Sequence, residues 1–245
     1  MKRFVAGYLK KKGKAVAKQV VVLFAAMSKA EDDDRAQTLI DQLDLDWSDI
    51  VPGIEDLLSA TAAQGVKDAL KQISFTAVDA TKLANERAEA WAADRAAELV
   101  GMKWIDGELV TNPNSEWSIS ESTRDMIYTD VDSAISEGWS NQKLSKAIQD
   151  NNGFSESRST MIARTETAFA DTQGNIAAYT EAKDAGIDVK MQWLTADDDL
   201  VSEECEMNNE VIAEIGEAFP SGATEPPQHP NCRCVLAPVV GDSAE

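Results

Sequence analysis

Residues 157–186, "SRSTMIARTETAFADTQGNIAAYTEAKDAG", read as one long helix, and this helix decides the fold class of the C-terminal half. Ser155 or Ser157 can cap its start, and the helix is expected to run to Lys183 and to end at Gly186. At about 100° per residue, one face collects a set of mostly apolar side chains: Ile162, Phe169, Gln173, Ile176 and Thr180. A helix of this length with such a face needs other helices to pack against.

A charged pair lies on or beside the same face, because Arg158 and Glu166 are turned toward the expected core. A buried carboxylate normally requires a partner. We therefore expect Glu166 to accept hydrogen bonds from a guanidinium, either that of Arg158 or one supplied from elsewhere in the chain, with Arg233 as the natural candidate. The functional alternative makes Glu166 a general acid or base, which requires a nearby nucleophile or an activated water.

The chain before this helix also reads as helical. Two helices are expected at about residues 121–137 and 141–150, and residues 1 to about 100 are rich in Ala, Leu, Glu and Lys. The clearest stripe is Ala84, Ala88, Trp91, Ala92, Ala96 and Leu99. Arg95 interrupts this stripe, so its side chain must reach water or a carboxylate. Residues 105–118 contain Gly107, Pro113 and several Asn, and we expect a hinge or domain boundary there.

After Gly186 the periodicity changes to that of strands. "VKMQWLT" places Val189, Met191 and Trp193 on one side, and "CRCVLAPVV" reads as a second strand. The acidic, Pro- and Gly-containing segment between them is loop-like. The predicted fold class is therefore mainly α with a small C-terminal β module (α+β). A helical N-terminal region precedes a helix-rich domain that ends in a short hairpin or sheet with a zinc-knuckle-like clamp.

The clamp is expected from four ligand-type side chains: Cys205, His229, Cys232 and Cys234. Three cysteines and one histidine satisfy the ligand count of a structural zinc site. The spacing is less regular, because Cys232 and Cys234 are only two residues apart and Cys205 has no CxxC partner. Two alternatives stay open: reduced, buried thiols beside a histidine bonded to backbone carbonyls, and a disulfide from Cys205 to Cys232 or Cys234.

Charge is distributed unevenly. The formal net charge is −20, from 43 acidic and 23 basic residues, which opposes nucleic-acid binding by most of the chain. Residues 1–30 nevertheless hold eight basic side chains and no acidic one. This basic amphipathic arm is expected to contact DNA or an acidic partner through a set of lysines: Lys10, Lys11, Lys12, Lys14 and Lys18.

The same N-terminal segment admits a second interpretation, a short signal peptide cleaved after Ala30. Three cysteines in 245 residues are too few for a disulfide-stapled secreted protein and favour a reducing compartment. No apolar run reaches the ~20 residues that a transmembrane helix needs, so no membrane contact is expected.

In their order, several C-terminal segments resemble the phage head morphogenesis, or minor head protein, family named after protein F of bacteriophage Mu. These segments are "GWSNQKLSKAIQD", "SRSTMIARTETAFADTQGNIAAY", "MQWLTADDDLVSEEC" and "PPQHPNCRC", and they cover about residues 118–236. The positions that carry the motifs, besides the metal ligands, are Arg164, Thr165, Trp193, Asp197, Pro230 and Asn231. One departure is that Ser202 stands where members often have the first cysteine of a CxxC.

The residue patterns predict a basic arm (1–30), a helical region (31–105), a linker (106–118) and a flexible acidic tail (237–245), and the resemblance implies a Mu F-like domain (119–236). It also implies a non-enzymatic, low-copy virion component in the head interior or at the portal vertex. Such a protein is made in the bacterial cytoplasm and contacts the portal, major capsid or scaffold protein. A metal-dependent hydrolase remains one alternative, with a water held by Cys205, His229 and a cysteine and with Glu166 or an Asp from 197–199 as base. A DNA-ejection protein is the other.

Overall fold

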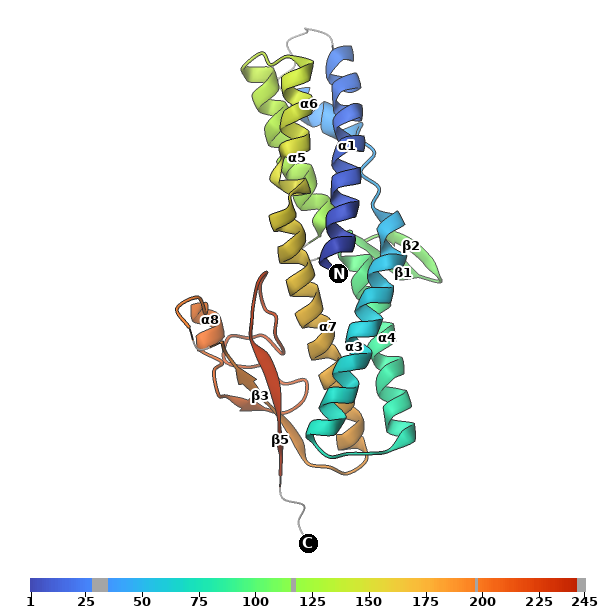
Figure 1. The fold of residues 1–245 in the computed structure, drawn as a ribbon, viewed down its shortest axis with the longest axis vertical. Helices are drawn as coiled ribbons and strands as arrows, with labels where there is room; N and C mark the ends of the chain where they lie inside the picture. Colours follow the sequence, from blue (N-terminus) through green and yellow to red (C-terminus); the bar gives the residue numbers. More distant parts are fainter. Residues whose placement is uncertain (28–34, 116–117, 197, 242–245) are drawn as a thin grey trace. The chain divides into compact units, whose positions relative to one another are not determined.

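The computed structural model describes residues 1–27, 35–115, 118–196 and 198–241, which divide into two compact units (Figure 1). One unit comprises Met1–Pro52 and Ala96–Thr160, and the other comprises Gly53–Arg95 and Met161–Glu245. The chain passes from one unit to the other at residues 52/53, 95/96 and 160/161, and each of these positions lies inside a helix. The units therefore do not follow the expected boundaries at residues 30, 105 and 118.

The first unit is mainly helical. Its elements are α1 (Lys2–Ala26), α2 (Arg35–Asp41), the 3-10 turn η1 (Ser48–Ile50), strands β1 (Met102–Ile105) and β2 (Glu108–Thr111), α5 (Ile119–Ser136), α6 (Asn141–Asp150) and η2 (Asn152–Phe154). The helices at 121–137 and 141–150 are thus where the sequence predicts them. Ser118 and Ser140 cap α5 and α6 through side chains that accept from backbone N–H groups three residues on.

Helix α1 is part of this unit's core. It packs against α6, η2 and α2, and it buries Val5, Leu9, Val16 and Val20 almost completely. Gly13 lies so close to Phe154 that a Cβ there would come within 2.7 Å of the ring. The expected arm is therefore a docked helix over residues 2–26, because its apolar side chains have a hydrophobic surface to bury against.

The expected linker contains a β-hairpin. Strands β1 and β2 pair antiparallel, with Met102 opposite Thr111 and Ile105 opposite Glu108. Asp106 and Gly107 form the two-residue turn with φ values of 51° and 83°. An Asp-Gly pair between alternating apolar residues is a strong signal for this turn, so a hairpin and not the expected hinge forms at Gly107.

The second unit combines helices with a small sheet. Its elements are α3 (Val51–Gln72), α4 (Val78–Glu98), α7 (Glu156–Asp184), β3 (Val189–Leu194), the short α8 (Glu203–Glu206), β4 (Ile212–Ala213) and β5 (Val235–Val240). The stripe of α4 is buried at Ala84, Ala88 and Ala92. Ser155 caps α7 by accepting from the backbone N–H of Arg158, and Gly186 follows the helix with a φ of 94°, as predicted.

Helices α3 and α7 approach each other very closely. A Cβ on Gly174 of α7 would lie 2.1 Å from the carbonyl oxygen of Ala62, and one on Gly65 of α3 would lie 2.6 Å from that of Asp171. Glycine at both positions lets the two backbones touch. Helix α7 therefore buries residues on more than one side, including Tyr179 and Ala178, and not only the predicted face.

The sheet has the order β4–β3–β5, and both pairings are antiparallel. Val189, Met191 and Trp193 of β3 are buried and alternate with half-buried residues, which confirms the predicted strand. The fold class is thus mainly α with a small C-terminal antiparallel sheet. Strand β5 runs to Val240, so the expected tail from residue 237 begins inside a strand, and residues 242–245 lie outside the described residues. In the described part of the chain, no helix has the length and apolar character of a membrane span.

Candidate metal centre

The ends of β3 and β5 bring the ligand-type side chains together. Leu194, the last residue of β3, pairs with Val235, the first residue of β5. The loop that leaves β3 and the segment that enters β5 therefore start side by side. The first loop carries Cys205 on α8, and the second carries His229, Cys232 and Cys234.

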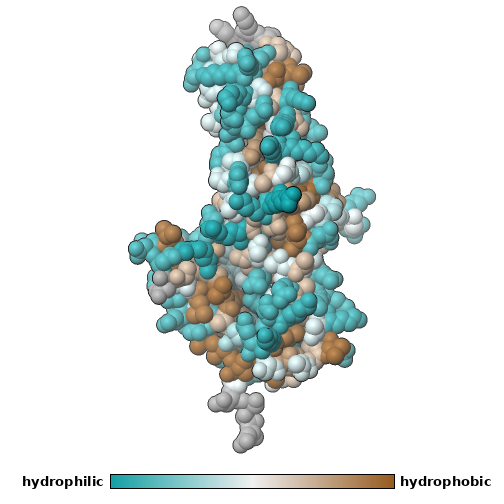
Figure 2. Space-filling model, viewed as in Figure 1, coloured by the Kyte–Doolittle hydropathy of each residue, from teal (hydrophilic) through white to brown (hydrophobic). Residues whose placement is uncertain are grey.

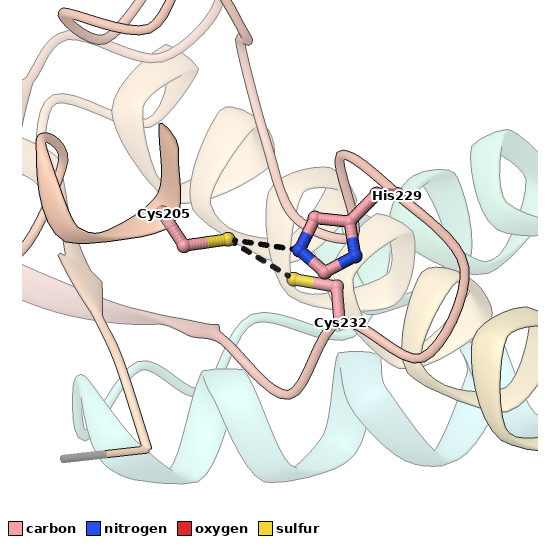
Figure 3. A group of neighbouring side chains, drawn as sticks. All are labelled: Cys205, His229 and Cys232. Atoms are coloured by element: carbon pink, nitrogen blue, oxygen red, sulfur yellow. Dashed lines mark hydrogen bonds between the residues drawn. The ribbon is translucent and has the colours of Figure 1, made fainter. Parts of the chain in front are cut away.

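Three of the four predicted ligands converge (Figure 3). The Sγ atom of Cys205 lies 3.3 Å from Nε2 of His229 and 3.7 Å from Sγ of Cys232, and all three ligand atoms lie within 4.8 Å of one another. In a tetrahedral zinc site two thiolates lie about 3.8 Å apart, and a thiolate and an imidazole nitrogen about 3.6 Å apart. The donor set and its spacing therefore fit a zinc ion.

The histidine ring has the tautomer that metal binding requires. Nδ1 of His229 lies 3.0 Å from the carbonyl oxygen of Pro230, which can only accept, so Nδ1 carries the proton in the neutral ring. The lone pair of Nε2 then faces Cys205. A backbone carbonyl on the other ring nitrogen is the usual outer contact of a metal-binding histidine.

A polar network that the sequence did not predict supports Cys205. The side-chain amide of Gln228 donates to Cys205 Sγ at 3.2 Å, and its carbonyl accepts from Ser221 Oγ at 2.8 Å. Fully buried Asn208 donates to that hydroxyl and accepts from the backbone N–H of Ser221. An N–H donor at sulfur stabilises the thiolate, which is the form that binds metal.

The fourth position has two candidates. Cys234 is outside the three-residue group, although its thiol donates a hydrogen bond to Cys232. That contact lowers the pKa of Cys232 to about 5 and raises the pKa of Cys234. On the other side, Ser202 Oγ lies 3.2 Å from His229 Nε2 while it caps α8 at the backbone N–H of Cys205. Ser202 therefore stands beside the cluster, where the resemblance places a family cysteine.

All three cysteines are free thiols, and Cys205 and Cys232 are too far apart at 3.7 Å for a bonded pair. The structure therefore does not contain the disulfide considered as an alternative. All three cysteines are buried, with at most 5% of any residue exposed.

Glu166 pairs with a guanidinium supplied from elsewhere in the chain, as expected, but this is Arg95 and neither of the two named candidates, Arg158 and Arg233. Its carboxylate accepts from Nε and Nη2 of Arg95, each at 2.9 Å, and both side chains are almost fully buried. The Arg95 guanidinium also lies 5.3 Å from the centre of the Phe169 ring. Arg95, which interrupts the stripe of α4, thus reaches the carboxylate of α7. The need for a partner of Glu166 was predictable from the sequence, whereas the identity of that partner was not.

Arg158 and Arg233 have other roles. The guanidinium of Arg158 is buried and donates to neutral acceptors: Thr123 Oγ1, Ser122 Oγ and the carbonyls of Ile119 and Gly153. Burial without a carboxylate lowers the pKa of Arg158. Arg233 forms a bidentate pair with exposed Asp198 and lowers the pKa of that carboxyl to about 2.

Some of the residues that carry the family motifs contact the ligand cluster or its loop, and others do not. Thr165 Oγ1 on α7 accepts from the backbone N–H of Asn231 at 3.0 Å, which joins the ligand loop to the helix. Asn231 has a φ of 64°, a conformation that asparagine tolerates. Trp193 is buried edge-on against Phe219, Pro230 supplies the carbonyl described above, and Arg164 is exposed. Asp197 lies outside the described residues.

The lysines of α1 divide into two groups. Lys10, Lys11, Lys14 and Lys18 are exposed. Lys12 instead turns into the first unit, where its ammonium group contacts the carbonyl oxygen of Asp46, the carboxylate of Asp49 and the rings of Tyr8 and Trp47. Lys12 is therefore not part of the exposed cationic face that the sequence predicts.

Comparison with known proteins supports the resemblance found in the sequence. Residues 125–237 match the family model described as phage Mu protein F like protein. This interval holds α6, α7, β3 and every predicted ligand. No curated protein and no solved structure matches the chain. Residues 125–237 are thus similar to phage Mu protein F like proteins, and this similarity supports a phage head morphogenesis protein in general.

Proposed function

We propose that this protein is a minor capsid protein of a tailed bacteriophage. In this proposal it is present in few copies, lies in the head interior or at the portal vertex, and helps to assemble infectious particles. The family match over residues 125–237 carries the proposal. The protein would be made in the host cytoplasm and end in the virion.

We further propose that its role is structural and not enzymatic. The cluster has buried sulfur ligands, as in structural zinc sites. Two of the carboxylates considered as bases, Glu166 and Asp198, are each held by both oxygens in arginine pairs. A zinc ion would be held by Cys205, His229 and Cys232, with Cys234 as the fourth ligand, and would fix the ligand loops to the sheet.

The partner is proposed to be the portal, major capsid or scaffold protein. Figure 2 shows hydrophobic surface over the region of the β3–β5 sheet. Exposed apolar side chains of this region include Ile212, Val235 and Val240, each 46–50% exposed. Apolar surface of this kind often marks a protein contact.

The experiment is quantitative mass spectrometry of purified particles and of assembly intermediates, with peptides from both units. We expect a few copies per portal vertex. A protein found only in the lysate, and absent from heads and intermediates, would contradict the proposal.

One observation favours the hydrolase as a second candidate: three side chains, Cys205, His229 and Cys232, form the group, and a catalytic zinc has three protein ligands. The zinc affinity of the Cys234→Ser variant distinguishes a structural site from a hydrolytic one. Loss of affinity shows a closed four-ligand site and removes the hydrolase, because a catalytic zinc keeps an open position. Unchanged affinity, together with zinc-dependent hydrolysis of a model ester or peptide, would favour the hydrolase.

A further inference from the structure

Helix α1 carries a cationic stripe that the fold leaves without internal partners. Arg3, Lys10, Lys11, Lys14 and Lys18 are all exposed, and at about 100° per residue they fall within an arc of about 100°. None of the five forms an ion pair within the described residues, whereas Lys2 pairs with Glu156 and Lys12 is turned inward. Because α1 packs against α6 and η2, the stripe is held on a fixed support.

A groove continues the stripe. At Lys18, α1 and α6 form the walls of a groove of about 780 Å³. Its α6 wall offers the side-chain amides of Asn141 and Gln142 and the hydroxyl of Ser145, whereas the Gln149 amide already donates to Ser145. Lys146 and Asp150 also line it, but they pair with each other at 2.7 Å, so among the described residues of the lining Lys18 is the charge without an ion-pair partner.

From these observations we infer that the stripe of α1 and the adjoining groove bind the phosphate backbone of duplex DNA. The stripe from Arg3 to Lys18 spans about 22 Å of helix. Duplex DNA carries one negative charge per about 1.7 Å of its axis, counted over both strands, so a stripe of this length faces several phosphates. The groove adds amide and hydroxyl groups, which commonly contact phosphates.

The negative charge of the rest of the chain restricts DNA binding to the cationic stripe of α1. The whole chain carries −20, so the rest of its surface repels DNA. Lysine contacts to phosphate carry no base information, so binding is independent of sequence. This inference does not depend on where the protein lies in the particle, and its failure would leave the proposed function intact.

The test is fluorescence anisotropy of the full chain with a labelled duplex of about 30 base pairs over a salt series. Five phosphate contacts give a slope of log affinity against log salt of about −4.5, or about 500-fold weaker binding between 50 and 200 mM salt. The triple variant Lys10→Gln, Lys14→Gln, Lys18→Gln should reduce the slope to about −1.8.

A matched control changes the same charge elsewhere. Lys67→Gln, Lys71→Gln, Lys103→Gln removes three exposed lysines that form no ion pair within the described residues, and it should bind as the wild type does. Circular dichroism checks that both variants fold. Absence of binding at low salt, or equal weakening in both variants, would overturn the inference. So would salt-sensitive self-association that the stripe variant loses without DNA binding, because the stripe would then contact the acidic surface of a second copy.

Discussion

The buried pair between Arg95 and Glu166 gives the sharpest test of how the second unit is held together. Glu166→Gln keeps the size of the side chain but removes its charge, so the Arg95 guanidinium, 4% exposed, would face a neutral amide. Breaking a buried pair in this way typically costs about 3–5 kcal/mol. That is a large part of the roughly 5–15 kcal/mol that stabilises most folded proteins.

The assay is urea unfolding followed by circular dichroism, with hydrogen exchange of the α7 amides as the local measure, because the chain has two units. Glu86→Gln is the matched control. It breaks the exposed pair with Lys82 on α4 and should cost less than about 1 kcal/mol. Arg95→Met with Glu166→Leu removes both charges and should cost less than Glu166→Gln alone. A Glu166→Gln variant as stable as Glu86→Gln would refute the reasoning.

Three further predictions concern other contacts. Cys232→Ser should weaken zinc binding by more than about 100-fold in a competition with a chelating dye, because outer residues alone change affinity about 10–100-fold; unchanged affinity would remove Cys232 from the site. Gly174→Ala should destabilise by about 1–3 kcal/mol in urea unfolding, because its Cβ would meet the Ala62 carbonyl at 2.1 Å. Gly7→Ala, where nothing lies within 4 Å, should stabilise instead, and a stable Gly174→Ala would show that the helices separate freely. Asp198 should titrate near pH 2 by nuclear magnetic resonance, since Arg233 lowers its pKa to about 2. The pair's contribution to stability is then present above the ordinary carboxyl pKa and is lost as pH falls through about 2. Arg233→Gln should return the Asp198 pKa toward its ordinary value, and no change would contradict the pairing.

Local signals predicted local structure well. The cap at Ser155, the end of α7 before Gly186 and the alternation of Val189, Met191 and Trp193 all depend on residues within a few positions of one another. The Asp106–Gly107 hairpin was equally local. Its signal is the Asp-Gly turn, which the Gly, Pro and Asn residues of the segment, typical of a boundary, do not distinguish from a linker.

Pairings between distant positions were not predictable from spacing. Glu166 required a guanidinium, but the choice among Arg95, Arg158 and Arg233 depends on which helices adjoin α7. Likewise, the ligand types were evident, whereas the outer residues Gln228, Ser221 and Asn208 were not. The signal that could have found Gln228 is its position beside His229, since neighbours of a ligand often support it.

The position of the ligand cluster explains why a metal would be useful here. The connection from β3 to β5 covers residues 195–234, and apart from α8 and β4 its described part has no regular structure. Ordering each backbone residue costs about 1–2 kcal/mol, and such a segment buries little apolar surface to offset that cost. Cys205 and Cys232 are 27 residues apart in sequence, and an ion held by both would close most of the connection into one loop. Closing a loop of that length costs about 3 kcal/mol of chain entropy, which is small beside the roughly 10–16 kcal/mol by which structural zinc binds small domains. A single ion could therefore order the connection, and the bond from Asn231 to Thr165 would then fix the closed loop to α7.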